Sequence, residues 1–149
     1  AMRHGVGGGC AAVLMVVAGT APAHPPEGSE VHIKVTHLRS TQGKVRACIV
    51  TEHRKYYTCK TPGVRRMAVP AGEEVTLVFR GIQPGRYAVS LIHDENDNDK
   101  ADTTLGIPRE GFGFSRNAKV RTGPPRFESV AFEVGSVPVR QTIVMQYLF

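Results

Sequence analysis

The fold class is decided by one stretch of the chain, VTLVFRGIQPGRYAVSLIH at residues 75–93. Its apolar residues alternate with their neighbours on both sides of a Gly- and Pro-containing turn at 81–85. A period of two is typical of β-strands that bury one face. The stretch therefore predicts two consecutive strands, whose inward residues are Val75, Leu77 and Phe79, then Tyr87, Val89 and Leu91.

The same alternation continues outward from this stretch. Segments 31–36 and 44–50 alternate and are expected to form a hairpin, 67–69 is a short strand, and 129–134 and 137–148 are two strands around a turn at Gly135. No segment has a helical pattern, so we expect an all-β fold: a single antiparallel β-sandwich of about seven strands, Ig-like, with long loops at one edge. The period places these residues in the core: Val45, Ile49, Val75, Leu77, Tyr87, Val89, Leu91, Ile143 and Met145.

Length and composition are those of one globular domain. The chain has 149 residues, 41% of them apolar, and a net charge of +6. This excludes a multidomain enzyme, a collagen-like chain, a disordered chain and a Cys-dense scaffold. We expect a linker at 24–30 and the β domain at 31–149.

The first segment has the pattern of a secretory signal peptide. A positive start at Met2-Arg3-His4 is followed by an apolar run centred on 10–18 and by the small residues Ala21-Pro22-Ala23. We expect residues 1–23 to be a cleaved signal peptide. The alternatives are a retained anchor, which would need a longer apolar run, and a lipid anchor on Cys10, which precedes that run. A cleaved chain would be periplasmic or secreted, with no membrane span and no nucleic-acid partner.

Two cysteines remain after that cleavage, Cys48 and Cys59. An even pair in an oxidising compartment indicates a disulfide. The alternative is a pair of buried thiols. No paired metal-ligand spacing accompanies them, which disfavours a zinc site.

An acidic segment at 93–102 carries the sharpest chemical signal. Side-chain oxygens recur there at positions 1, 3, 5 and 9 of a calcium-loop pattern, and position 7 offers a backbone carbonyl. The candidate ligands are Asp94, Asn96, Asn98, Lys100 and Asp102. Position 6 is Asp99 instead of Gly, and position 12 is Leu105 instead of Glu. Two interpretations therefore remain: a calcium-binding loop, and a polar turn in which Asp and Asn side chains cap their own backbone.

The segment 106–127 is a long Gly-, Pro- and Arg-rich loop. A loop of this length is uncommon unless it is functional or ordered by its own packing. It predicts a ligand or anion-binding surface made of His93, Arg109, Glu110, Ser115, Arg116, Asn117, Arg121 and Arg126. In the alternative, the arginines neutralise the acidic segment, while Phe112, Phe114 and Phe127 pin the loop to the core.

Other chemistry has weaker support in the sequence. His24 would become the N-terminus after cleavage, where an amine and an imidazole can bind copper, but His32, His37, His53 and His93 have no diagnostic spacing. No nucleophile elbow, zinc-protease motif or phosphate loop is present. We therefore expect a protein that is not an enzyme.

Three segments together resemble a known family. They are H-D-E-N-x-N-x-x-x-D from His93, G-I-P-x-E-G-x-G-F-S-x-N-A from Gly106, and G-P-P-x-F from Gly123. They resemble a bacterial family of small exported proteins catalogued as a domain of unknown function. The resemblance spans roughly 31–149 and implies a prealbumin-like or carboxypeptidase-regulatory-like β-sandwich. In that family the acidic loop usually carries Gly at the position of Asp99.

The sequence thus predicts an exported binding or structural module of the cell envelope, whose partner is an envelope protein or a small ligand. One alternative is a carrier of a small ligand or anion that uses the 94–127 edge. The other is a metal-dependent enzyme whose site has no recognisable motif.

Overall fold

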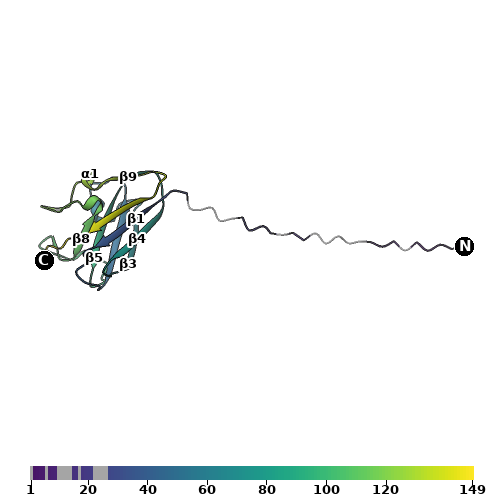
Figure 1. Cartoon of the computed structure of the whole chain (residues 1–149), viewed down its shortest axis with the longest axis horizontal. Coiled ribbons are helices and arrows are strands. Elements are labelled where there is room, and N and C mark those ends of the chain that lie inside the picture. The colour runs from purple at the N-terminus through teal and green to yellow at the C-terminus, as the bar shows by residue number, and fades with distance from the viewer. Residues whose placement is uncertain (1, 6, 10–14, 17, 22–26) are drawn as a thin grey trace.

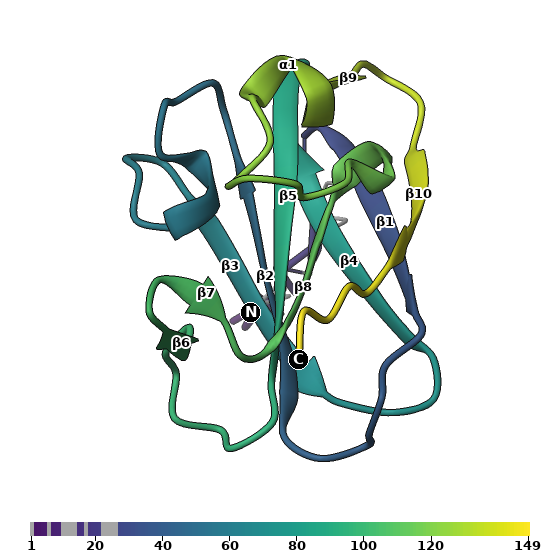
Figure 2. The ribbon, with the colours of Figure 1, turned by 90° about the vertical axis from the view of Figure 1, so that its left-hand side faces the viewer.

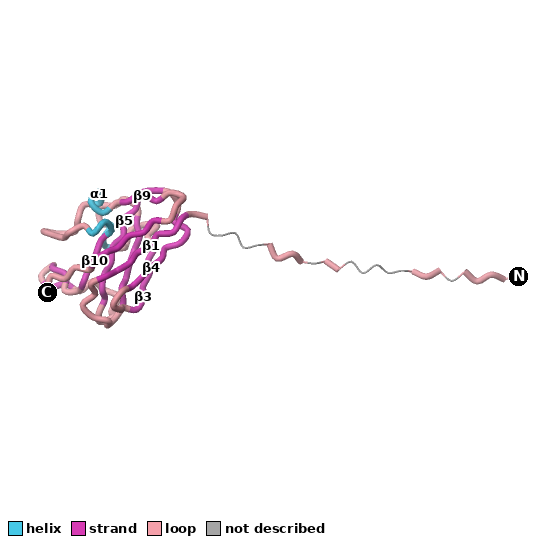
Figure 3. The backbone as a smooth tube through the Cα atoms, viewed as in Figure 1, coloured by secondary structure: helices cyan, strands magenta, loops and turns pink. Residues whose placement is uncertain are grey.

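The computed structural model describes residues 2–5, 7–9, 15–16, 18–21 and 27–149, and the folded body begins near residue 27 (Figure 1). Most of its regular structure is strand, and its helical segments are single turns (Figure 3). The expected cleavage site after Ala23 and His24 lie outside the described residues, which include only part of the expected signal peptide. No helix among the residues described is long and apolar enough to cross a membrane.

The strands form two main sheets. The smaller sheet has the order β10 (Val139–Val144), β1 (Ser29–Thr36), β4 (Val75–Ile82). The larger sheet has the order β3 (Arg65–Pro70), β2 (Lys44–Val50), β5 (Gly85–Asp94), β8 (Gly111–Phe114). Most pairs are antiparallel, as expected, but β1 and β10 run parallel.

The prediction of a hairpin is wrong. Segments 31–36 and 44–50 do not form one, because β1 belongs to the smaller sheet and β2 to the larger one. Two strands do flank Gly135, as expected, but they join different partners: β9 (Phe132–Val134) pairs with the start of β5, and β10 pairs with β1. Residues 127–130 form a helical turn, α1 (Phe127–Val130), and not the beginning of a strand. Alternation identifies a strand but does not identify its neighbour.

The principal core is shared by the two main sheets. Inward residues of β1 and β4 in one sheet pack with those of β2 and β5 in the other, and with Ile143 and Met145 near the chain end. Eight of the nine expected core residues are buried, which confirms the strand phasing. Tyr87 is half-buried and packs against the core from its edge.

The larger sheet is also buried on its opposite face. Cys48 and Val50 of β2, Ala88 of β5 and the two phenylalanines of β8, Phe112 and Phe114, pack there with Tyr56 of the short helical turn η1 (Tyr56–Thr58) and with Phe127, Val130 and Ala131. The disulfide between Cys48 and Cys59 ties the end of η1 to β2 and confirms that prediction, with a Cα–Cα distance of 5.7 Å. The expected pinning of segment 106–127 by its phenylalanines is likewise confirmed.

Segment 106–127 is more regular than the sequence indicates. It contributes the fourth strand of the larger sheet, β8, and then a helical turn, η2 (Ser115–Asn117). Between β5 and β8 the chain makes a small hairpin, β6 (Thr103–Thr104) and β7 (Ile107–Pro108), on the side of the molecule away from α1 (Figure 2). This hairpin and the acidic loop before it form the edge where the candidate site lies.

Candidate functional site

The acidic loop is anchored at Asp94, the last residue of β5, whose side chain is fully buried. Arg46 on the neighbouring strand β2 donates from Nε to Asp94 Oδ2 at 2.5 Å. The backbone N–H groups of Asn98 and Asp99 donate to the same carboxylate at 3.1 and 2.9 Å. Asp94 is thus a fully partnered carboxylate that folds the loop back on itself.

The guanidinium of Arg46 serves several carboxylates. It also contacts Asp97 at 2.7 Å and Asp99 at 3.2 Å, and Lys44 adds an ion pair to Asp97 at 2.9 Å. Burial by itself would raise the pKa of Asp94, but the hydrogen bonds from Arg46 and from the two backbone amides outweigh it and lower that pKa. Cations on β2 therefore relieve the repulsion that first suggested calcium.

The remaining expected calcium ligands bond to one another. Asn96 and Asn98 both donate side-chain N–H groups to the carboxylate of Asp102, at 2.8 to 3.1 Å. The backbone N–H of Lys100 donates to Asn98 Oδ1 at 3.0 Å. No group of three or more His, Cys, Asp or Glu side chains in the described ranges is arranged to hold a metal ion. Calcium binding by these five residues stays a prediction.

Asp99 occupies a backbone conformation that glycine adopts more readily. Its φ is +59°, in the left-handed region. Asp tolerates this region better than most residues, and here its side chain gains the contact with Arg46. The loop therefore accommodates Asp at the position where the family usually has Gly.

His93 is not a surface residue, which corrects its assignment to the ligand-binding surface. Its side chain is fully buried, and Nε2 lies 2.8 Å from the carbonyl oxygen of Gln42, to which it donates. Nδ1 therefore accepts from the hydroxyl of Tyr147, also at 2.8 Å. A Cβ at Gly111 would lie 2.4 Å from the Tyr147 ring, so glycine at that position makes room for this contact.

Ser115 and Asn117 are also structural. Ser115 is fully buried, donates to the carbonyl of Val130 at 2.6 Å and accepts from the N–H of Val89 at 3.0 Å, so its expected surface position is wrong. Asn117 bonds β10 with both ends of its amide, accepting from the N–H of Val144 and donating to the carbonyl of Thr142. The Ser115 side chain is thus closed to a ligand, and the Asn117 amide holds β10 in place.

The arginines of segment 106–127 do not neutralise the acidic loop. Within the described part of the chain, no ion pair joins Arg109, Arg116, Arg121 or Arg126 to a carboxylate. All four are exposed, and the Arg116 guanidinium donates to the backbone carbonyl of Glu128, at 3.3 Å. The neutralising cations, Lys44, Arg46 and Arg39, come from outside that segment.

A cavity of about 460 Å³ opens between the acidic loop and the β6–β7 hairpin. Its wall consists of Arg39, Glu95, Asn96, Asp102, Thr103, Arg109 and Glu110. Arg39 and Glu95 neutralise each other there through an ion pair at 2.5 Å, and Ser40 donates to the second oxygen of Glu95 at 2.8 Å. Although burial would raise the pKa of Glu95, the bonds from Arg39 and Ser40 lower it.

Glu110 is the one acidic wall residue that is buried. It is 7% exposed, and its Oε2 accepts from the backbone N–H of Asp102 at 3.2 Å. Its Oε1 has no hydrogen-bond partner among the described residues. Burial, followed by the negative charges of Asp94, Asp102 and Glu95, raises the pKa of Glu110, although the bond from Asp102 opposes this.

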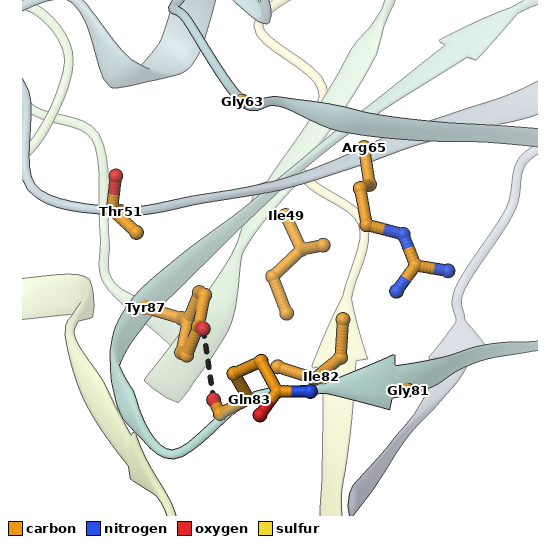
Figure 4. A pocket seen from close by; sticks show the side chains of 8 residues that line it. All are labelled: Ile49, Thr51, Gly63, Arg65, Gly81, Ile82, Gln83 and Tyr87. Carbon is orange, nitrogen blue, oxygen red and sulfur yellow. Dashed lines mark hydrogen bonds between the residues drawn. The ribbon is translucent and has the colours of Figure 1, made fainter. Parts of the chain in front are cut away.

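A second, smaller hollow of about 180 Å³ is lined in equal parts by residues 49–65, from β2 to the start of β3, and by residues 81–87, from the end of β4 to β5 (Figure 4). The hydroxyl of Tyr87 donates there to the carbonyl of Gln83 at 2.8 Å, and Arg65 donates to the carbonyl of Arg80 (Figure 4 shows the first bond). Arg65 is the one charged residue among the described residues that line it, and none of these has a buried side-chain nitrogen or oxygen without a hydrogen-bond partner. It is the weaker candidate.

Comparison with known families gives one match. A family model described as "Uncharacterized protein conserved in bacteria (DUF2141)" matches residues 33–142. The chain belongs to this family. Neither the curated proteins nor the solved structures contain a significant match.

Within the segments that carry the family resemblance, most polar residues have a structural task. His93, Asp94, Ser115 and Asn117 are satisfied by contacts inside the fold, as described above. Glu110 is the exception, because it lines the cavity and its buried Oε1 has no hydrogen-bond partner among the described residues.

Sequence reasoning did not identify Arg39, Arg46 and Tyr147. Each contacts the 93–110 segment from a distant part of the chain. Two of them also contact each other, because the guanidinium carbon of Arg39 lies 4.6 Å from the centre of the Tyr147 ring. A signal for Arg46 was present in the alternation of β2, where a charged residue lies between Val45 and Ala47. Nothing in the sequence indicated that it would meet Asp94.

Proposed function

We propose that this protein is an exported binding module of the cell envelope, and that it takes a small polar ligand at the cavity beside Glu110. The observation that carries the proposal is the cavity of about 460 Å³, whose wall holds Asp102 and Glu110, two carboxylates that form no ion pair among the described residues. A ligand with hydrogen-bond donors would complement this wall, because hydrogen bonds to ionised carboxylates are stronger than neutral ones.

The class of the fold, the location of the protein and the binding role each have support of their own. Two sheets around one core favour a β-sandwich of the Ig-like or prealbumin-like kind. The Cys48–Cys59 disulfide weakly favours an oxidising, extracytoplasmic location, in the periplasm or outside the cell. A binding role is favoured over catalysis because His93 and Ser115 are engaged by the fold and have no access to the cavity.

The test is native mass spectrometry of the protein purified from its own envelope under non-denaturing conditions. We expect wild type to retain a small molecule that the Glu110→Gln variant loses. Glu128→Gln is the matched control, because Glu128 is an exposed carboxylate on α1, away from the β6–β7 hairpin (Figure 2). Equal retention by all three proteins, or retention by none, would contradict the proposed site.

A further inference from the structure

The positive charge of the chain is concentrated in two short segments, 53–60 and 119–126. Together they contain six Lys and Arg residues and no Asp or Glu, so their charge of +6 equals the net charge of the whole chain. The rest of the chain is therefore neutral overall. All six cations are exposed, and we call them the cationic face: Arg54, Lys55, Lys60, Lys119, Arg121 and Arg126.

The two segments meet over the outer face of the larger sheet. The hydroxyl of Tyr56, in the first segment, donates to the carbonyl of Pro125, in the second, at 2.8 Å. The ring of Tyr56 packs edge-on against that of Phe127, with centres 5.8 Å apart. The second segment belongs to the chain between η2 and α1, which crosses in front of β5 in Figure 2. Because the disulfide at Cys59 also ties the first segment to β2, both segments are anchored to the fold.

The cations of this face have no partner within the described part of the chain. None of the six side chains forms an ion pair or a hydrogen bond there. Residues 27–149 contain twelve other Lys and Arg, and nine of these pair with a carboxylate or donate to a backbone carbonyl. The lack of partners is thus particular to this face. Like charges held together repel one another, and an anion from outside the chain would relieve that repulsion.

The surroundings of these cations indicate what kind of anion fits. The large apolar side chains that are exposed in the described residues all lie outside the two segments. None of the six cations lines either of the two hollows described above. A protein partner usually buries an apolar centre, and a small ligand usually occupies a hollow. An extended anionic surface requires neither, because it attracts clustered Lys and Arg through its potential alone.

We infer that the cationic face binds the surface of an anionic phospholipid bilayer, with its Lys and Arg side chains against the headgroup phosphates and no apolar side chain inserted. An Arg guanidinium can donate two N–H groups to one phosphate, and three of the six cations are Arg. This inference is independent of the ligand site proposed above, because no residue of the two segments lines the cavity beside Glu110.

The experiment is cosedimentation of the purified protein with large unilamellar vesicles at pH 7. One set of vesicles contains phosphatidylcholine alone, and the other contains equal parts of phosphatidylcholine and phosphatidylglycerol. We expect binding to the second set only. Raising the salt concentration from about 50 mM to about 500 mM should abolish that binding, because salt shortens the range of the attraction.

A pair of double variants with equal net charge tests the assignment to this face. Lys55→Gln with Arg121→Gln removes one cation from each segment and should weaken binding roughly twentyfold, because each cation near the membrane contributes about fivefold. Lys34→Gln with Arg140→Gln removes the same charge from neighbouring strands, on the outer face of the smaller sheet. That control should weaken binding by less than about threefold, since its charges lie across the fold from the membrane. An unchanged urea midpoint for the first double variant would establish that it is folded.

Several results would overturn the inference. Equal weakening by the two double variants would show that net charge, and not this face, drives binding. Binding to phosphatidylcholine alone, or binding that persists at high salt, would contradict an electrostatic contact with anionic headgroups. If polyglutamate or alginate binds to the face and the phosphatidylglycerol vesicles do not, the partner is an acidic polymer and the assignment to lipid is wrong. Absence of binding to the vesicles at low salt would reject it outright.

Discussion

Replacing Arg46 with Ala should destabilise the fold more than any other single change at the acidic loop. The variant leaves Asp94 fully buried without its cation, and it also removes the contacts to Asp97 and Asp99. Breaking a buried ion pair costs about 3–5 kcal/mol. Arg46 is 26% exposed, and Asp94 keeps two backbone donors, so we expect a loss of about 2–3 kcal/mol at pH 7.

The assay is urea unfolding of wild type and variant at several pH values. With an m-value of about 1.5 kcal/mol/M, the midpoint at pH 7 should fall by roughly 1.5 M. Because folding lowers the pKa of Asp94 below its ordinary value of 3.8, wild type has this stabilisation in full above that value and loses it as pH falls through the lowered pKa. Without Arg46, Asp94 loses the strongest interaction that lowers its pKa, so the difference between the two proteins should shrink on acidification.

A matched control separates charge from packing. Arg46→Gln keeps a polar side chain on β2 but has no charge, and it should lose most of the same stability. A loss below about 0.5 kcal/mol for Arg46→Ala, typical of a surface change, would refute the account of the loop. A loss that stays constant down to pH 2 would show that packing, and not the ion pair, is responsible.

Four further predictions concern the core and the site. Leu91→Ala should cost about 2–5 kcal/mol in urea unfolding, because Leu91 is fully buried between the sheets, and a loss within about 0.5 kcal/mol would contradict its core position. Gly111→Ala should cost about 1–3 kcal/mol, because its Cβ meets the Tyr147 ring, and an unchanged midpoint would contradict the close packing. Glu110→Gln should stabilise the ligand-free protein by about 1 kcal/mol at pH 7, because folding raises the pKa of Glu110 and its ionised form therefore opposes folding. The gain should disappear when the pH falls below 4.5, the ordinary pKa of this carboxyl, and a gain that is independent of pH would refute this cause. If the calcium prediction is right, millimolar calcium should raise the melting temperature by a few degrees over chelator in wild type and not in Asp102→Asn, and no difference between calcium and chelator would reject it.

The strands and the principal core were predictable because they depend on local alternation. Segment 75–93 shows the period clearly, and its inward residues are buried apart from Tyr87. The sheet to which each strand belongs was not predictable, since β1 and β2 alternate equally well and alternation says nothing about partners. The strand β8 was missed because two of its four residues are glycines. Those glycines adjoin the Tyr147 ring and Ile143, contacts that only the folded chain reveals.

The sequence predicted which region of the chain holds the candidate site, but not which residues form it. The sequence correctly placed the acidic loop next to the segment that carries Glu110, and it identified the Cys48–Cys59 disulfide. It could not show which polar residues of that region serve the fold and which remain open to a ligand, because His93 and Ser115 look as reactive in the sequence as Glu110 does. Burial and hydrogen bonding separate them: the first two are satisfied by the fold, and Glu110 is not.

The central claim is that the cavity beside Glu110 is the ligand-binding site. The most direct measurement is a map of amide chemical-shift changes when a small-molecule extract of the native envelope is added to ¹⁵N-labelled protein. The account predicts changes at Asn96, Thr103 and Glu110 that disappear in Glu110→Gln. Changes confined to the exposed arginines at 116–126, or changes that persist in Glu110→Gln, would contradict it.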